Sequence, residues 1–520
     1  MKQVLMLASE NGALGGAKVG GMADVIRDLP APLYEQGIIA NLVMPSYGFL
    51  INQTNARSIG EFTVRFRGSK QLVRVFETNN PITKDALCYL LDHPDWHSTA
   101  GNLYTDSGNR PFADDANKFA LFGVAVAEAL YQKVIPAPDI IHLHDWHAGF
   151  YTLCTHLMTR FNELTKIPTV MTIHNLAIQG LRPLRDDESS LEAWFPSLWS
   201  TISKQDIETI SDPRYRNCIN PMRVAINFAQ RVHVVSPTYA NEVIKPSNSK
   251  LGYFGGEGLE TDLINKGKKL FGIINGCNYD HQSTDNNFQE MTQLAIDTML
   301  RWQGDNESVT GQGDIIIQRL KKLLAKKVEP DFLLTSVGRL TDQKVLILRQ
   351  PYPPYRTVLE AILAKLAEYS DKALFIMLGS GDVMITNEFR RVAVNNPNFI
   401  FINGYAEQIA KCLYQQGDLF LMPSSFEPCG ISQMLAMREG QPCLVHGVGG
   451  LNDTVEHDKS GFVFNGADLI DQSKNLIQTF EETLKIHSTD RWKKIKRSAK
   501  ARRFSWQGVA KAMKKRLYHF

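Results

Sequence analysis

The sequence predicts an α/β protein with two doubly wound parallel sheets in series, and three observations lead to this prediction. The chain has 520 residues, more than one hydrophobic core usually serves, so two domains of roughly 250 residues are expected. Short apolar runs alternate with helical patterns over the first half, which is typical of βαβ units. This alternation stops in a polar stretch at 281–313, which allows at most one helix, and then starts again.

Each element is predicted from its local pattern. In the first half, apolar runs bounded by turn residues predict strands at 4–9, 38–44, 139–143, 169–173 and 231–235. Apolar residues at helical spacing predict helices at 22–36 and 119–130. In the second half, the same criteria predict strands at 332–337, 373–378, 398–402, 419–422 and 443–445, with helices at 357–369 and 433–438. Three prolines within 351–354 predict an extended loop at 349–356. The domain boundary is expected between 244 and 273.

Composition narrows the class of protein. Apolar residues make up 43% and charged residues 21%, as in globular proteins. No apolar run approaches the roughly 18 residues of a membrane span, and none fits a signal peptide, so a cytoplasmic or plastid-like location is expected. Seven dispersed cysteines without a CxxC pair argue against disulfides and structural zinc. Residues 491–516 carry twelve Lys and Arg and no acid; solvated helix faces are favoured over nucleic-acid or membrane binding, because no recognition module accompanies them.

Polar and glycine-rich segments follow several predicted strands, where doubly wound sheets bind ligands. The first is the loop at 12–21, in which Gly20 and Gly21 would let backbone approach an anion beside Lys18. A glycine-rich loop of this kind has a purely structural role as often as it binds a ligand. The strand at 139–143 leads into Asp145, with His142 and His144 on one face, and the next strand leads into His174. Without a second His or Cys cluster, contacts to sugar or phosphate are favoured over a metal. His174 alone could equally be a core histidine.

The second half carries more specific signals. Arg339 and Lys344 lie on a loop after a strand and suit a diphosphate. The loop at 423–431 carries Glu427 and opens a helix near Ser432, whose N-terminus favours phosphate. Glu427 could meet sugar hydroxyls, or simply be a solvated acid or a partner of Arg438. A further glycine-rich loop follows at 447–451.

These motifs together resemble those of bacterial glycogen synthases and plant starch synthases, retaining glycosyltransferases with the two-lobed GT-B fold. The matching segments occur in family order and span nearly the whole chain: KVGGMADV (18–25), HDWHAG (144–149), TIHNLA (172–177), SPTY (236–239), NG (275–276), RLTDQK (339–344), FEPCG (426–430), GGLNDTV (449–455) and FSW (504–506). The resemblance implies two Rossmann-like domains facing a cleft, at 1–260 and 261–500, with a last helix at 501–520 returning to the first domain.

The resemblance also implies transfer of glucose from ADP-glucose to the non-reducing end of an α-1,4-glucan, with retention and without metal or cofactor. Arg339 and Lys344 would neutralise the leaving diphosphate. The remaining roles follow residue by residue: Glu427, His174 and Asp145 hold the glucosyl unit, Asn275 orients it, Lys18, Gly20 and Gly21 lie near the donor phosphates, Tyr405 stacks on the base, and Cys429, Gly430, Ile431, Ser432, Gly449 and Gly450 complete the nucleotide site.

Some positions depart from the family pattern. Ser425 stands where an Arg is usual, Asn278 where an Asp is usual, and Val345 replaces a Gly ahead of the inserted loop at 349–356. The donor nucleotide and the acceptor are therefore open. Two alternatives follow: a GT-B transferase that uses UDP-glucose or a small acceptor, and a non-catalytic glucan-binding scaffold. The oligomeric state is not predicted.

Overall fold

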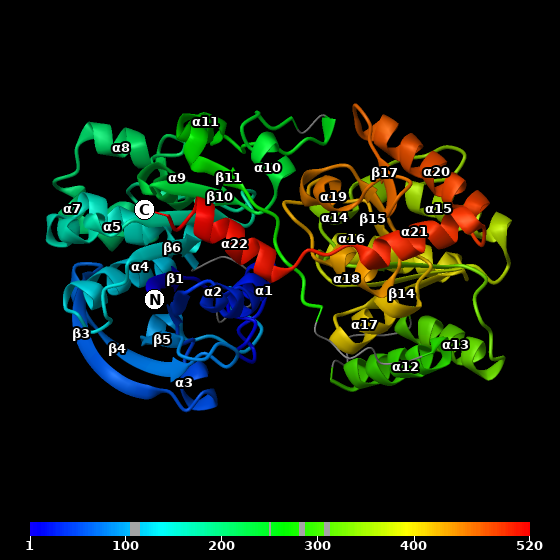
Figure 1. Ribbon diagram of the computed structural model, residues 1–520, viewed down its shortest axis with the longest axis horizontal. Helices are drawn as coiled ribbons and strands as arrows, with labels where there is room; N and C mark the ends of the chain where they lie inside the picture. Colours follow the sequence, from blue (N-terminus) through cyan, green and yellow to red (C-terminus); the bar gives the residue numbers. More distant parts are fainter. Residues whose placement is uncertain (105–114, 249–250, 280–286, 306–311, 520) are drawn as a thin grey trace. The chain divides into compact units, whose positions relative to one another are not determined.

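The computed structural model describes residues 1–104, 115–248, 251–279, 287–305 and 312–519. The chain forms two compact units. Unit 1 comprises Met1–Ser247, Gly255–Gly276 and Ser505–Phe520; unit 2 comprises Asn248–Phe254 and Cys277–Phe504. Figure 1 colours the chain by sequence and labels many of the elements named below.

Unit 1 is built on a sheet with the strand order β11-β10-β7-β6-β1-β2-β5-β4-β3. Its strands are β1 (Lys2–Leu7), β2 (Ile38–Pro45), β3 (Arg57–Phe66), β4 (Ser69–Asn79), β5 (Leu87–Asp92), β6 (Ile140–His144), β7 (Thr169–Ile173), β10 (Arg231–Val234) and β11 (Leu270–Gly272). Neighbouring strands run parallel except that β4 is antiparallel to both β3 and β5. The strands predicted in the first half are confirmed, whereas β3, β4, β5 and β11 were not predicted.

Helices surround this sheet. They are α1 (Gly21–Asp28), α2 (Pro30–Glu35), α3 (Leu50–Gln53), α4 (Asp115–Tyr131), α5 (Gly149–Leu157), α6 (Leu191–Trp194), α7 (Pro196–Trp199), α8 (Lys204–Ile210), α9 (Pro221–Phe228), α10 (Pro237–Glu242), α11 (Glu260–Lys266) and α22 (Trp506–Arg516). The single helix predicted at 22–36 is wrong: it is divided into α1 and α2, because Pro30 has no N–H to continue the hydrogen-bond ladder. The last helix, α22, packs beside α2 (Figure 1).

Unit 2 contains a fully parallel sheet with the order β14-β13-β12-β15-β16-β17. Its strands are β12 (Leu333–Val337), β13 (Leu374–Gly379), β14 (Phe399–Asn403), β15 (Leu419–Met422), β16 (Cys443–His446) and β17 (Gly461–Phe464). All five strands predicted for the second half are confirmed within a residue or two at each end. The order reverses direction between β12 and β15, which is the switch point of a doubly wound sheet.

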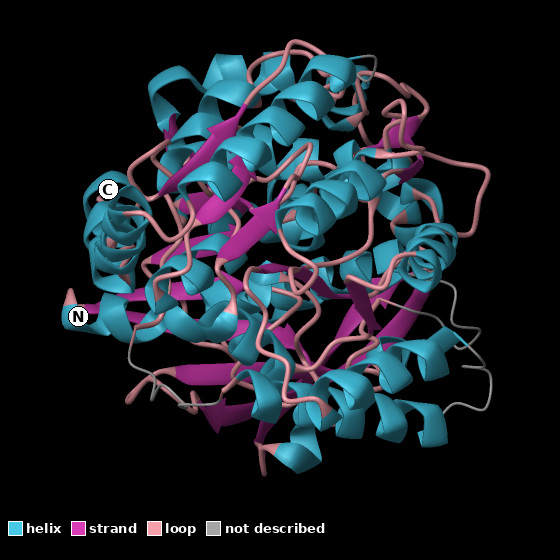
Figure 2. Cartoon of the chain, turned by 90° about the vertical axis from the view of Figure 1, so that its right-hand side faces the viewer, coloured by secondary structure: helices cyan, strands magenta, loops and turns pink. Residues whose placement is uncertain are grey.

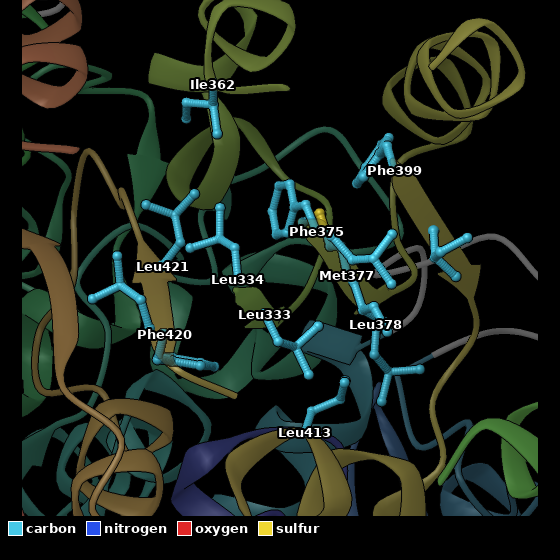
Figure 3. Packing of buried hydrophobic residues seen from close by; sticks show 14 of the residues in the cluster. Leu333, Leu334, Ile362, Phe375, Met377, Leu378, Phe399, Leu413, Phe420 and Leu421 are labelled. Carbon is cyan, nitrogen blue, oxygen red and sulfur yellow. The ribbon is translucent and has the colours of Figure 1, made fainter. Parts of the chain in front are cut away.

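Helices cover both faces of this second sheet. They are α12 (Phe288–Asp305), α13 (Gln312–Ala325), α14 (Asp342–Val345), α15 (Val358–Tyr369), α16 (Val383–Asn395), α17 (Glu407–Gln416), α18 (Ser432–Glu439), α19 (Gly449–Thr454), α20 (Leu469–Ile486) and α21 (Asp490–Ala501). Figure 3 shows Ile362 of α15 and Leu413 of α17 on opposite sides of the strands, with Leu334 pointing to the first side and Leu333 to the second. This alternation places one apolar layer on each face of the sheet.

Figure 2 shows the chain from a second side, with helices in cyan and strands in magenta. Within the polar stretch at 281–313, α12 is the one helix that the sequence allowed, and several neighbouring residues fall outside the described ranges. The loop predicted at 349–356 is confirmed except at its first residue: Arg349 ends a 3-10 helix (Ile347–Arg349), and residues 350–357 after it form no helix or strand. Over the residues described, no helix combines the length and the apolar character needed to cross a membrane.

Candidate functional site

In unit 2, two of the predicted motifs leave the sheet at the switch point. The loop at 338–341 follows β12, and the loop at 423–431 follows β15, which is the neighbour of β12 in the sheet. Backbone and side-chain hydrogen bonds join the two loops: Ser425 N donates to Gln343 O at 2.9 Å, and Gln343 Nε2 donates to Phe426 O at 3.0 Å. The tertiary structure therefore brings the two motifs side by side at the edge where such sheets bind ligands.

Lys344, which the sequence analysis placed on a loop, lies in the short helix α14 that follows residues 338–341, and it forms an ion pair with Glu427 of the second loop. Their side chains are 18% and 7% exposed, so the carboxylate is the more buried partner. Ser424 Oγ donates a second hydrogen bond to Glu427 Oε2 at 3.1 Å. Of the readings that the sequence left open for Glu427, the solvated acid and the pairing with Arg438 are both wrong, since Arg438 pairs with Glu439 instead. A cation and a carboxylate are thus held together at the switch point.

Arg339 lies at the start of the same loop and is exposed. The short helix α14 that follows is held from outside by Arg349, which pairs with Asp342 and with Glu388 of α16. Arg349 belongs to the segment that departs from the family pattern. The segment from Arg339 to Lys344 is therefore fixed at its helical end, and the guanidinium of Arg339 stays accessible to an anion.

The glycine-rich loop after β16 packs directly against the Glu427 loop. Gly450 N donates to Glu427 O at 3.1 Å. A Cβ on Gly449 would lie 2.0 Å from Glu427 O, and a Cβ on Gly450 would lie 2.2 Å from Cys429 O. Gly449 also has a φ of +43°, which favours glycine. These two glycines are required for the backbones of the two loops to approach each other, and not only for a ligand.

The Glu427 loop ends in helix α18, which begins at Ser432. Its N-cap, Ile431, provides no side-chain cap, and Gly430 has a φ of +74°. Gln433 Nε2 instead donates to the carbonyls of Cys429 and Gly430, at 3.1 and 3.0 Å, and so holds the turn from within. A helix N-terminus carries partial positive charge and N–H donors, which suit an anionic group.

Tyr405 follows β14 and is 62% exposed. A cavity of about 230 Å³ opens at the carboxyl ends of β13 and β14; its lining includes Ser380, Gly381, Arg390 and Asn403. Tyr405 lies two residues after Asn403 in the chain. An exposed ring at this edge of the sheet offers an apolar surface to a planar ligand.

In unit 1, the loop with Lys18 differs from the anion cradle that the sequence suggested. Glu10 Oε2 accepts hydrogen bonds from Val19 N and Gly20 N, at 2.8 and 2.6 Å. Lys18 Nζ pairs with Asp24 Oδ1 at 2.6 Å, and helix α1 begins at Gly21. The N–H of Gly20 is therefore used by a carboxylate of the same chain. The sequence analysis missed Glu10, although an acid directly after a buried strand was a usable signal.

Asp145 and His174 meet at the carboxyl ends of β6 and β7. Asp145 Oδ1 accepts from His174 N at 2.7 Å, and Asp145 itself has a φ of +56°, which is uncommon for a residue with a side chain. Burial raises the pKa of Asp145 to about 7, although this backbone hydrogen bond opposes the shift. Burial also lowers the pKa of His174 to about 3. His174 Nε2 bonds to His144 Nδ1 at 2.9 Å, so the imidazole is neutral and oriented.

Asn275 follows β11 and is 4% exposed. Its Oδ1 has no hydrogen-bond partner among the residues that the structure describes. An unsatisfied buried acceptor costs free energy unless a ligand or water completes it. Asn275 is therefore available to a hydroxyl donor. Within the described ranges, no group of three or more His, Cys, Asp or Glu is arranged to hold a metal ion.

Comparison with known proteins supplies independent information. The family model described as "Starch synthase catalytic domain" matches residues 3–265, and the model described as "Glycosyl transferases group 1" matches residues 314–481. The glycogen synthase of Variovorax paradoxus is 32% identical, over 95% of this chain and 94% of its own length. The glycogen synthase of Photobacterium profundum is 30% identical, over 98% of this chain and 92% of its own.

Solved structures agree with the fold. The catalytic domain of starch synthase IV from Arabidopsis thaliana, bound to ADP and acarbose, has a TM-score of 0.73 at 24% identity and is matched over 99% of this chain and 98% of its own. Sucrose-phosphate synthase from Thermosynechococcus elongatus has a TM-score of 0.53 at 15% identity, over 100% and 98%. The predicted fold class, two Rossmann-like α/β domains of the GT-B type, is confirmed by these likenesses.

Proposed function

The chain belongs to the glycogen and starch synthase family of glycosyltransferases, and from this premise we propose that it transfers glucose from ADP-glucose to the non-reducing end of an α-1,4-glucan, with retention of configuration. The observation that carries the proposal is the contact of helix α14, which carries Lys344, with the Glu427 loop at the switch point of unit 2. A full-length relationship to glycogen synthases indicates the reaction, and this contact supplies groups that suit it.

The leaving diphosphate sets the largest electrostatic demand of the reaction. Arg339 is accessible, and Lys344 is held at the switch point by its ion pair with Glu427. Both cations, Arg339 and Lys344, are proposed to neutralise phosphate oxygens as negative charge develops on them. The N–H groups at the start of α18, at Ile431 and Ser432, are proposed to bind the same diphosphate. Gly430, Gly449 and Gly450, with Cys429, keep the loop backbones close enough to present these groups.

The sugar and the base have separate proposed ligands. In unit 1, His174, Asp145 and Asn275 are proposed to bind glucosyl hydroxyls; the free Oδ1 of Asn275 supports this role. Lys18, with Gly20 and Gly21, is proposed to contact the donor after Lys18 leaves Asp24. In unit 2, the exposed ring of Tyr405 is proposed to stack on adenine. The relative with bound ADP supports the choice of ADP-glucose over UDP-glucose.

Retention is proposed to follow a front-face route. The bond from the anomeric carbon to the diphosphate oxygen breaks, and the bond to the acceptor 4-hydroxyl oxygen forms on the same face of the sugar. The proton of that hydroxyl passes to the departing phosphate oxygen, so no protein nucleophile is needed. Glu427 is already paired with Lys344 and is proposed to bind sugar hydroxyls rather than to attack, unlike the nucleophile of a retaining glycosidase.

A donor panel with glycogen as the acceptor tests the proposal. ADP-glucose and UDP-glucose, each labelled in the glucose, are supplied separately, and label in precipitated glycogen is counted. We expect incorporation from ADP-glucose and its loss in Lys344→Met. Lys411→Met is the matched control, because Lys411 forms an exposed ion pair with Glu407 on α17. A preference for UDP-glucose would overturn the donor assignment, and no transfer from either nucleotide sugar would refute the proposed activity.

A further inference from the structure

A row of buried polar side chains crosses the sheet of unit 1 beneath the proposed sugar ligands. Tyr518 Oη lies 2.6 Å from His142 Nδ1, and His142 Nε2 lies 2.6 Å from Thr172 Oγ1. Thr172 Oγ1 in turn lies 2.9 Å from His233 Nδ1, and His233 Nε2 lies 3.1 Å from the carbonyl of Ile273. The side chains are at most 2% exposed, so they have no access to solvent.

These side chains form a hydrogen-bonded relay from Tyr518 to the carbonyl of Ile273. The direction of every hydrogen bond in the relay follows from this carbonyl. A carbonyl only accepts, so His233 carries its proton on Nε2. Burial lowers the pKa of His233 to about 4 and that of His142 well below its usual value, so both rings are neutral. His233 Nδ1 must therefore accept from the Thr172 hydroxyl. That hydroxyl, having donated its one proton, accepts from His142 Nε2, and His142 Nδ1 accepts from Tyr518.

Residues of the relay precede the proposed sugar ligands by two positions along the chain, so they lie farther from the carboxyl ends of the strands. His142 precedes His144 by two residues on β6, and Thr172 of β7 precedes by two residues His174, which directly follows that strand. Side chains two residues apart in a strand share a face, and the rings of His142 and His144 are 4.2 Å apart. The relay ends on the backbone of Ile273, two residues before Asn275.

We propose that Thr172 and Tyr518 are positioning residues, which hold the carboxyl ends of β6, β7, β10 and β11 in the arrangement that orients His174 and Asn275 toward the sugar. The inference rests on the proposed function of those two ligands. A relay with a single possible polarity resists alternative tautomers and rotamers, because any reversal leaves a buried donor or acceptor unpaired. Tyr518, near the end of the chain, donates the first hydrogen bond of this relay.

A matched set of threonine variants separates positioning from stability. Thr172→Val keeps the shape but removes both hydrogen bonds of the hydroxyl, and Thr172→Ser restores them. Thr169→Val is the control: it lies on the same strand, is also buried, and loses a 2.6 Å hydrogen bond to Gln230, but at the amino end of β7. We expect Thr172→Val to lower kcat about 10-fold, with Thr172→Ser and Thr169→Val within about 2-fold of the parent. Equal losses in both valine variants would overturn the proposal.

Two readouts do not depend on transfer. Nitrogen-15 NMR of the histidine rings should show His142 and His233 protonated on Nε2, and Tyr518→Phe should perturb His142 first. A proton on Nδ1 of either ring would refute the relay. Thr172→Val, but not Thr169→Val, should shift the side-chain amide of Asn275 and the ring of His174; unchanged signals would refute positioning. If the parent transfers no glucose, the proposed function fails, whereas these signals still decide whether the relay orients the layer above it.

Discussion

Replacing Asp145 by Asn should stabilise this protein relative to the parent, and the difference in the free energy of unfolding should grow as the pH rises. Burial raises the pKa of Asp145 from 3.8 to about 7, so the fold favours the protonated carboxyl. The stabilisation from that proton is complete below pH 3.8 and is lost as pH rises through 7. Asn mimics the protonated carboxyl: its oxygen can still accept from His174 N, and it cannot ionise.

The magnitude follows from the two pKa values. One pKa unit corresponds to about 1.4 kcal/mol, so the full penalty for burying the charge is about 4 kcal/mol. Between pH 5 and pH 8 the penalty grows by about 2.5 kcal/mol, because it rises with each pH unit until the carboxyl ionises in the folded state near pH 7. The buried histidines titrate in both proteins, so their contribution cancels in the difference.

Urea titrations of parent and Asp145→Asn at pH 5, 6, 7 and 8 test this prediction. Two compact units do not guarantee a two-state transition, so unfolding of unit 1 should be followed separately, by hydrogen exchange of peptides from β6 and β7. The stability difference should grow by about 2.5 kcal/mol and level off above pH 7. A difference that stays constant within about 0.5 kcal/mol would refute a raised pKa at Asp145.

Three further predictions concern stability. Lys344→Met should destabilise unit 2 by about 3 kcal/mol and Glu427→Gln by less, since the first leaves the more buried charge unpaired; equal losses in urea titrations would contradict this. Gly450→Ala should lower the melting temperature, because the added Cβ would overlap the carbonyl of Cys429. Gly338→Ala is the control, since its Cβ would meet no atom within 4 Å and should leave the melting temperature unchanged. Equal shifts of the two variants in calorimetry would refute the close packing at Gly450. Unit 1 should lose stability as pH falls below about 6.5, because histidines such as His174 have folded pKa values near 3; circular dichroism that shows no loss down to pH 4 would exclude this.

Several strands were predictable because their residues need no distant information. β7 runs over Thr169–Ile173, the range that its apolar run predicts, and the strands at the centre of both sheets are buried on both faces. The missed hairpin has a different pattern. Arg57–Phe66 and Ser69–Asn79 alternate polar and apolar residues, because an antiparallel edge exposes one face, and such alternation is easily overlooked among loops.

The candidate site, like the fold, was predictable only in part. The motifs, in their order along the chain, were enough to suggest the family and the GT-B fold by resemblance. Most of them follow a strand, and parallel strands end at one edge of a sheet. The partners of those motifs were not predictable. Glu10 takes the N–H of Gly20, and Asp24 holds Lys18, which depends on the path of the loop rather than on its composition.

The sequence by itself determined the doubly wound fold class, the central strands in their order and the residue types available at their ends, because these depend on local periodicity and backbone chemistry. Only the tertiary structure decided which of these groups meet. Lys344 and Glu427 are 83 residues apart in the chain, and Tyr518 and His142 are 376 apart. Such contacts form because packing buries polar groups that must then find partners, and the partner is whichever group the folded sheet places beside them.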